Sequence, residues 1–314
     1  SRINAVASDV AIPVEPRLFG LLERSLELSR ATHGAMDITA APLAELWRSA
    51  REMERIPTME EIARVRRSVG YQYVELDPDR RTIRFTRPGM RIDLGCIGKG
   101  FALDETSRIL TEAGIRNFLY HGGFSSILAR GSKDDGPISV AESSTATMEP
   151  SGTSGTESGP AEFSTVSGEA VSGDTEKKSF VATGSGWTVG LRDPDHPERR
   201  LAKLRLRNRA LGTSGSQIRF FRYRGRRYGH LLDPRTGWPP QTNRAVTVVA
   251  PDATLADGLS TAFYVLSSEE IVTFCEEHAE QYPGLSVLLV DTDVESGHEI
   301  MTYGFGPEDL VSES

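Results

Sequence analysis

Residues 91–104, RIDLGCIGKGFALD, combine glycines, an acid and a lysine in a pattern that could bind an anion. An extended apolar run at 90–94 leads into the glycines, and a helical pattern follows from Phe101. The first N–H groups and the dipole of a helix attract phosphate, and Asp93 and Lys99 would add a carboxylate and a cation beside it. The segment favours a phosphorylated ligand, held directly or through a metal ion. An ordinary strand-to-helix turn stays open as the alternative, because the segment has neither the GKS or GKT ending of a P-loop nor the G-x-G-x-x-G spacing of a dinucleotide fold.

Asp257 and Thr261 form a second candidate group. They lie four residues apart in LADGLSTAF, where a helix is predicted from about Thr254, so both side chains project from one helix face. A carboxylate, a hydroxyl and a backbone carbonyl from elsewhere are hard oxygen ligands, which suit Mg²⁺ better than zinc. The alternative is that Asp257 favours the first helical turn for electrostatic reasons and that Thr261 packs inside.

His230 is the third candidate, in the segment RYGHLLDP, which is predicted to be a strand that ends in a proline turn. An imidazole can act as a general base near neutral pH, but a histidine beside apolar neighbours is also a common core residue. Both interpretations stay open. Ser214 has no histidine or acid nearby in a nucleophile-elbow context, so the sequence gives little support to a serine hydrolase.

Composition and charge narrow the class of protein. The chain has 314 residues with 38% hydrophobic and 25% charged, which is typical of a globular protein with one large or two small domains. A net charge of −8 argues against a general nucleic-acid binder, and the basic run RFFRYRGRR at 219–227 is interpreted as a solvated hairpin. The cysteines, Cys96 and Cys275, give neither a disulfide framework nor a zinc spacing. No membrane-spanning stretch and no signal peptide are visible, so the compartment stays open.

The order of the expected elements favours an α+β fold over a doubly wound sheet, because strands run in hairpins rather than alternating with helices. Helices are expected at 16–31, 42–51, 59–68, 103–113, from about 254, and at 268–278. Strands are expected within 71–85, 117–131, 184–194 and 201–215, around Gly225, and at 245–250, 286–291 and 299–303. The Ser-, Thr-, Gly- and Glu-rich segment at 132–184 is predicted to be a disordered insertion.

Five segments together resemble the ApbE-type FAD:protein FMN transferases, or flavin transferases. They are HGAMDITAAPLAELW, RIDLGCIGKGFALD, LYHGG, ALGTSG followed by RYGHLLDPRTGWP, and LADGLSTAFYVL. They follow the family's order from about Asn4 to the final strands and skip only the low-complexity insertion. The resemblance implies a single T-fold-like α+β domain over 1–314, with mixed or antiparallel sheets and flanking helices. It also implies that FAD binds in a cleft with Mg²⁺ at the pyrophosphate.

The resemblance assigns roles to the candidate residues. The side chains of Asp257 and Thr261 and the backbone carbonyl of Cys96 would hold Mg²⁺, and Asp257 would thereby be catalytic. His230 would be the base that takes the proton of the acceptor hydroxyl. The residues expected to contact FAD all lie in the family's motifs. They are Ala35, Met36, Asp37, Asp93, Lys99 and Leu231.

The family moves FMN from FAD to a Ser or Thr hydroxyl of a redox flavoprotein and leaves AMP. Two alternatives stay open at this point: a FAD pyrophosphatase that uses water as the acceptor, and a FAD-binding carrier without turnover. The family's segment upstream of Ser1 is missing from the chain. By resemblance we expect the cell envelope, on the periplasmic side of the inner membrane, with membrane association through an N-terminal anchor that this sequence does not contain.

Overall fold

The computed structural model describes residues 1–123, 125–133, 164–167, 186–194, 196, 198–215, 220–240, 244–293 and 297–311. Its helices are α1 (Arg2–Val6), α2 (Pro16–Ala31), α3 (Ala41–Glu52), α4 (Met59–Arg66), α5 (Gly98–Glu112), α6 (Ala253–Val265) and α7 (Ser268–Glu277), with short 3₁₀ helices η1 (Ile38–Ala40) and η2 (Tyr71–Tyr73). Most of the predicted insertion at 132–184 lies outside the described residues. Within it the structure describes residues 132–133 and a strand, β6 (Ser164–Ser167).

The strands form antiparallel sheets. Their bounds are β1 (Ile12–Pro13), β2 (Val74–Asp77), β3 (Thr82–Phe85), β4 (Phe118–His121), β5 (Ser126–Arg130), β7 (Trp187–Arg192), β8 (Arg200–Leu206), β9 (Ala210–Gly215), β10 (Phe220–Tyr223), β11 (Arg226–Gly229), β12 (Arg244–Ala250), β13 (Ser286–Asp293), β14 (Gly297–Tyr303) and β15 (Leu310–Val311). Within the described residues, the central sheet has seven strands in the order β4-β5-β9-β12-β13-β14-β6. Smaller sheets have the orders β1-β3-β2, β15-β8-β7 and β10-β11.

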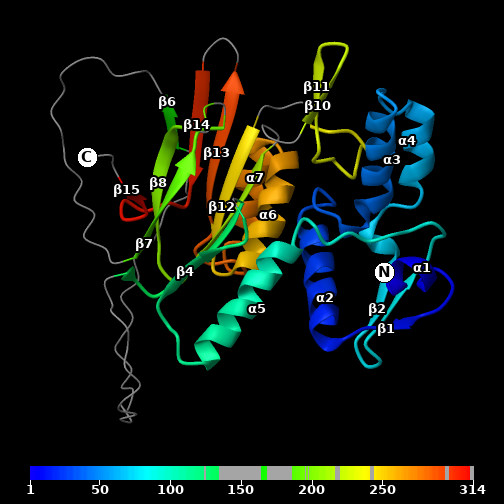
Figure 1. Ribbon diagram of the computed structural model, residues 1–314, viewed down its shortest axis with the longest axis horizontal. Coiled ribbons are helices and arrows are strands. Elements are labelled where there is room, and N and C mark those ends of the chain that lie inside the picture. The colour runs from blue at the N-terminus through cyan, green and yellow to red at the C-terminus, as the bar shows by residue number, and fades with distance from the viewer. Residues whose placement is uncertain are drawn as a thin grey trace.

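The central sheet separates two hydrophobic cores (Figure 1). Strand β12 contributes to both, because successive side chains of a strand point to opposite faces. Val246 and Val248 pack with helices α2, α5, α6 and α7 on one face. Val249 packs on the other face with the sheet β15-β8-β7. The result is a layered α+β arrangement with α6 buried along most of its length.

A third core joins helices α3 and α4 to the hairpin β10-β11 (Figure 1). The indole of Trp47 lies at its centre, with ring centroids 5.6 Å from Tyr228, 6.2 Å from Phe221 and 5.3 Å from Trp238. The Trp47 Nε1–H donates to the carbonyl of Gly237 at 2.8 Å. This core holds the chain on both sides of the predicted base His230.

The extended run at 90–94 does not become a strand. The side-chain amide of Asn4 replaces a partner strand there: it donates to the Ile92 carbonyl at 3.0 Å and accepts from the Ile92 N–H at 2.9 Å. The Asp93 N–H donates to the Ile38 carbonyl at 2.8 Å. The segment is therefore fixed by side-chain and loop contacts, which a hydrophobicity pattern does not reveal.

Candidate active site

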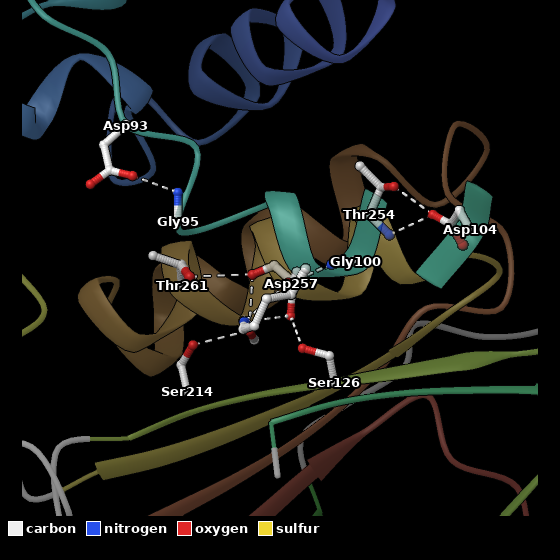
Figure 2. A network of polar contacts seen from close by, with 11 residues as sticks. Asp93, Gly95, Gly100, Asp104, Ser126, Ser214, Thr254, Asp257 and Thr261 are labelled. Carbon is white, nitrogen blue, oxygen red and sulfur yellow. Dashed lines mark hydrogen bonds and ion pairs between the residues drawn. The ribbon is translucent and has the colours of Figure 1, made fainter. Parts of the chain in front are cut away.

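The carboxylate of Asp257 is the centre of the polar network in Figure 2. Its side chain is only 3% exposed, and it points between α6, the start of α5 and the central sheet. Oδ2 accepts from the backbone N–H of Gly100 at 2.8 Å, and Oδ1 accepts from the hydroxyl of Ser126 at 2.6 Å. The ammonium group of Lys99 lies 3.2 Å from Oδ2 and 3.4 Å from Oδ1. A buried carboxylate needs such partners, because burial without them is costly.

Helices α5 and α6 cap one another. Residue Ile97, before α5, provides no side-chain cap, and Asp257 of α6 supplies the missing acceptor for Gly100 in the first turn of α5. In return, Asp104 of α5 accepts from the backbone N–H groups of Ala253 and Thr254 in the first turn of α6, at 2.9 and 2.8 Å. Carboxylates at both helix N-termini favour this arrangement electrostatically. Lys99 consequently lies in the first turn of α5, and not in a loop before it as the sequence suggested.

Two glycines allow α6 to lie this close to its neighbours. A Cβ added to Gly100 would overlap the carbonyl of Ala253 and would lie 2.8 Å from the Cα of Thr254. A Cβ on Gly212 of β9 would overlap the carbonyl of Ala256 and would lie 2.8 Å from the backbone N of Asp257. The glycines therefore determine how near Asp257 comes to the start of α5 and to the sheet.

Further hydroxyl groups surround the start of the second turn of α6 (Figure 2). Thr261 Oγ1 and Ser260 Oγ both donate to the backbone carbonyl of Asp257, at 3.2 and 3.0 Å. Ser260 Oγ also lies 3.0 Å from Ser214 Oγ of β9. Ser214 lies in β9, within the region 201–215 where strands were expected, and pairs with Val246 of β12.

Cys96 lies near three acidic side chains. Burial, together with the negative charges of Asp93, Asp37 and Asp257, raises the pKa of its thiol to about 12. The predicted metal-ligand segment around Cys96 is thus close to the acidic residues of both predicted FAD-binding motifs. A thiol with this pKa stays protonated at neutral pH and is a poor nucleophile.

The thiols of the folded protein should therefore resist alkylation. Burial raises the pKa of Cys275 to about 12 as well. Because only the thiolate reacts, we expect iodoacetamide to label neither Cys96 nor Cys275 in native protein at pH 8, and to label both in guanidinium chloride. Mass spectrometry of the two samples tests this. Rapid labelling of native Cys96 would show that its thiol is neither protected by burial nor raised in pKa.

The motif at 35–37 lies on the loop before η1. Ala35 and Met36 are 1% exposed, so any contact that they make with a ligand would use backbone atoms. Asp37 caps η1: Oδ1 accepts from the N–H and the hydroxyl of Thr39, and Oδ2 accepts from the N–H of Tyr71 at 2.9 Å. Burial raises the pKa of Asp37 although these hydrogen bonds oppose the shift.

Asp93 lies on the loop that leads into α5 (Figure 2). Its side chain is exposed, and Oδ1 accepts from the N–H of Gly95 at 2.8 Å. Because its own N–H donates to Ile38, the loop that carries it is tied to the loop of Asp37. The two predicted FAD-binding loops are therefore neighbours.

His230 and Leu231 lie on a separate element. His230 is the first residue after β11, one position beyond the strand expected for it, and its side chain is exposed. Leu231 is half-buried against the main core. The structure thus joins Lys99 and Thr261 to Asp257 by hydrogen bonds, and it places His230 at the end of the hairpin β10-β11.

In the described part of the chain, no group of three or more His, Cys, Asp or Glu side chains could hold a metal ion. The expected Mg²⁺ ligands include only one acidic side chain and therefore do not form a group of this kind. Over the same residues, no helix combines the length and the apolar character needed to cross a bilayer.

The chain has a layered α+β fold with antiparallel sheets, and the Lys99–Asp257 pair lies at the start of α5. The sequence model of the ApbE family matches residues 1–183 and 167–286, so the chain belongs to the ApbE family. This confirms the family and the α+β fold that the motifs indicated.

Individual relatives agree with that assignment. A FAD:protein FMN transferase of Treponema pallidum is 27% identical over 298 residues, which cover 93% of this chain and 70% of the relative. The Escherichia coli K12 protein of the same name is 24% identical over 301 residues, covering 94% and 70%. The crystal structure of the ApbE protein of Thermotoga maritima superposes with a TM-score of 0.70 at 25% identity and covers 95% of this chain and 79% of that one. The Pseudomonas stutzeri flavinyl transferase ApbE, with a TM-score of 0.68 at 23% identity over 97% and 80% of the two chains, shares the fold.

Proposed function

We propose that this protein is a Mg²⁺-dependent FAD:protein FMN transferase, which moves FMN from FAD to a Ser or Thr hydroxyl of an acceptor flavoprotein. The observation that carries the proposal is the pair of Lys99 and buried Asp257 at the N-terminus of α5. The ammonium group of Lys99 is half-exposed at the N-terminus of a helix, where the cation and the helix dipole both favour a pyrophosphate. The names of the curated relatives support the same activity.

The residues present fit a magnesium ion. Asp257 carboxylate, Thr261 hydroxyl and Cys96 carbonyl are hard oxygen donors of the type that Mg²⁺ takes. Among the described residues, no hydrogen bond to the Cys96 carbonyl is recorded, so that acceptor is available. The Lys99 ammonium already lies beside both oxygens of Asp257, so the site accommodates positive charge. Mg²⁺ bound there would neutralise negative charge on the pyrophosphate.

The reaction breaks one bond and forms another. The acceptor hydroxyl oxygen bonds to the phosphorus of the FMN half, and the bond from that phosphorus to the bridging oxygen breaks, so AMP leaves with that oxygen. Lys99 and the dipole of α5 stabilise the negative charge that develops on the phosphate oxygens. His230 takes the hydroxyl proton, because a hydroxyl is a weak nucleophile until it is deprotonated.

The test is a flavin-transfer assay. The protein is incubated with FAD and Mg²⁺, with and without a redox flavoprotein that exposes a threonine, and AMP and in-gel flavin fluorescence are measured. We expect AMP and a fluorescent acceptor band, loss of both with EDTA, and recovery with added Mg²⁺. Cys96→Ala keeps the carbonyl and should retain turnover. AMP released equally without acceptor would favour a FAD pyrophosphatase, and bound FAD without AMP in either sample would contradict both enzymes.

A further inference from the structure

The basic run of the sequence forms the hairpin β10-β11, whose two faces have different roles. Register pairs Phe221 with Tyr228, and both contact the ring of Trp47 on α3. The hairpin is thus anchored through this inner face, and it projects from the body beside α3 and α4 (Figure 1). The opposite face, called the outer face here, includes the exposed residue Arg222.

The outer face carries like charges directly opposite one another. Arg222 of β10 pairs in register with Arg227 of β11. Both guanidinium groups lie over the ring of Phe220, at 5.8 and 4.0 Å from its centroid, and Phe220 is 37% exposed. Like charges at opposite positions of a hairpin are destabilising. An anionic group would reach this face through Arg222, which is an exposed residue.

The tip of the hairpin has a second unfavourable feature. Arg224 and Gly225 both have positive φ angles, 48° and 78°, as in the tight hairpin turn that normally takes Asn-Gly. Arginine is uncommon in this left-handed conformation, where asparagine is frequent. The Arg224 guanidinium lies over the ring of Tyr223, 5.4 Å from its centroid. Positions that break a local rule are often functional.

The charge of the hairpin contrasts with that of the whole chain. Residues 220–229 contain four arginines and no acid, whereas the chain carries a net charge of −8. In the described residues, neither Arg222 nor Arg224 forms an ion pair with a carboxylate. Both side chains belong to exposed residues. A partner with an acidic segment would therefore be oriented toward this hairpin by the field of the protein.

The hairpin leads directly into the predicted site, because β11 ends at Gly229 and His230 and Leu231 follow. We propose that the outer face and tip of β10-β11 form the docking surface for an acidic segment of the acceptor protein, which brings the acceptor hydroxyl toward His230. This inference rests on the proposed function, which requires a protein acceptor. An anionic membrane can also be bound by a cluster of about four cations, so it is the competing occupant that the experiment below must exclude.

A double variant tests the docking surface without disturbing the fold. Arg222→Gln with Arg224→Asn removes two charges. Asparagine suits the left-handed conformation of residue 224, so the melting temperature of the double variant should equal or exceed that of wild type. The matched control is Arg80→Gln with Arg199→Gln, which removes two charges from side chains that are 83% and 69% exposed on other elements. The probes are two fluorescein-labelled peptides, each with one threonine, flanked by glutamates in one and by glutamines in the other.

Binding is measured by fluorescence anisotropy at low and physiological salt. AMP release from FAD by the wild-type protein is measured separately, with the redox flavoprotein acceptor of the transfer assay. We expect the glutamate peptide to bind wild type and the control alike, and the hairpin variant about tenfold more weakly, with the difference shrinking as salt rises. Equal binding to all three proteins, or equal binding of both peptides, would overturn the proposal. So would hairpin-dependent binding of phosphatidylserine vesicles without binding of the glutamate peptide. If the protein cleaves FAD but does not bind the glutamate peptide, the docking surface alone is overturned. If it binds the peptide but does not cleave FAD, the proposed function alone is overturned.

Discussion

Asp257→Asn should lower the rate of AMP release by about a thousandfold, because the amide cannot bind a cation as the carboxylate does. The carboxylate is the only acidic side chain among the proposed Mg²⁺ ligands, and it also faces Lys99. Asparagine keeps the shape of the side chain. The loss should therefore appear chiefly in kcat and in the Mg²⁺ concentration that supports half-maximal rate.

The change should also cost stability, because one of the donors Gly100 N–H and Ser126 hydroxyl would then face an amide N–H₂ group. We expect a loss of about 1–3 kcal/mol in the free energy of unfolding. Asp252→Asn is the control at the start of the same helix, because asparagine caps α6 through the N–H of Leu255 equally well. It loses only the partly exposed ion pair with Arg24, which contributes up to about 1 kcal/mol. If Asp257→Asn retained wild-type turnover, the ligand assignment would be wrong.

Gly100→Ala should destabilise the protein more than Gly98→Ala, the other glycine-to-alanine substitution in the motif GKG at 98–100. Its Cβ would overlap the backbone carbonyl of Ala253, and backbone cannot move aside as a flexible side chain can. Separating α5 from α6 would also break the hydrogen bond from residue 100 to Asp257. We expect a loss of about 3 kcal/mol in the free energy of unfolding, measured by urea denaturation, together with loss of FAD cleavage.

Gly98→Ala is the internal control, two residues away in the same helix. The nearest atom to its added Cβ, the Cβ of Leu94, is at 3.7 Å, which is ordinary contact. Alanine in a helix is favoured over glycine, so the protein should be unchanged or up to about 1 kcal/mol more stable. Equal destabilisation by both substitutions would show that the helices are not in close backbone contact at Gly100.

The sequence was informative where local chemistry decides the structure. The hairpin around Gly225 and helix α6 follow from a glycine turn and from the cap at Asp252, and both are local signals. The grouping of Lys99 with Asp257 was accessible only through the family resemblance, since no local pattern connects them. The roles of Thr261, Cys96, His230, Leu231 and the motif at 35–37 remain predictions.

The features that escaped prediction depend on distant partners. Helix α5 begins at Gly98 because a carboxylate from another helix caps it, and residues 90–94 pair with the Asn4 side chain instead of a strand. Ser126 and Asp104 gave no signal as single residues, because their importance comes from the groups that the fold places beside them. Gly100 and Asp104 are four residues apart in GKGFALD, and this spacing becomes informative only when α6 is known to contact both of them.

The long separation of the paired residues has a consequence for the nascent chain. Lys99 and Asp257 are 158 residues apart, and Ser126 and Asp257 are 131 apart. Contacts between such distant segments form late, because closing the intervening loop is entropically costly. During translation, the ribosome would release Lys99 and Ser126 well before Asp257. A polypeptide interrupted before α6 would therefore lack the central carboxylate, and the proposed flavin chemistry would begin only after α6 has been synthesised.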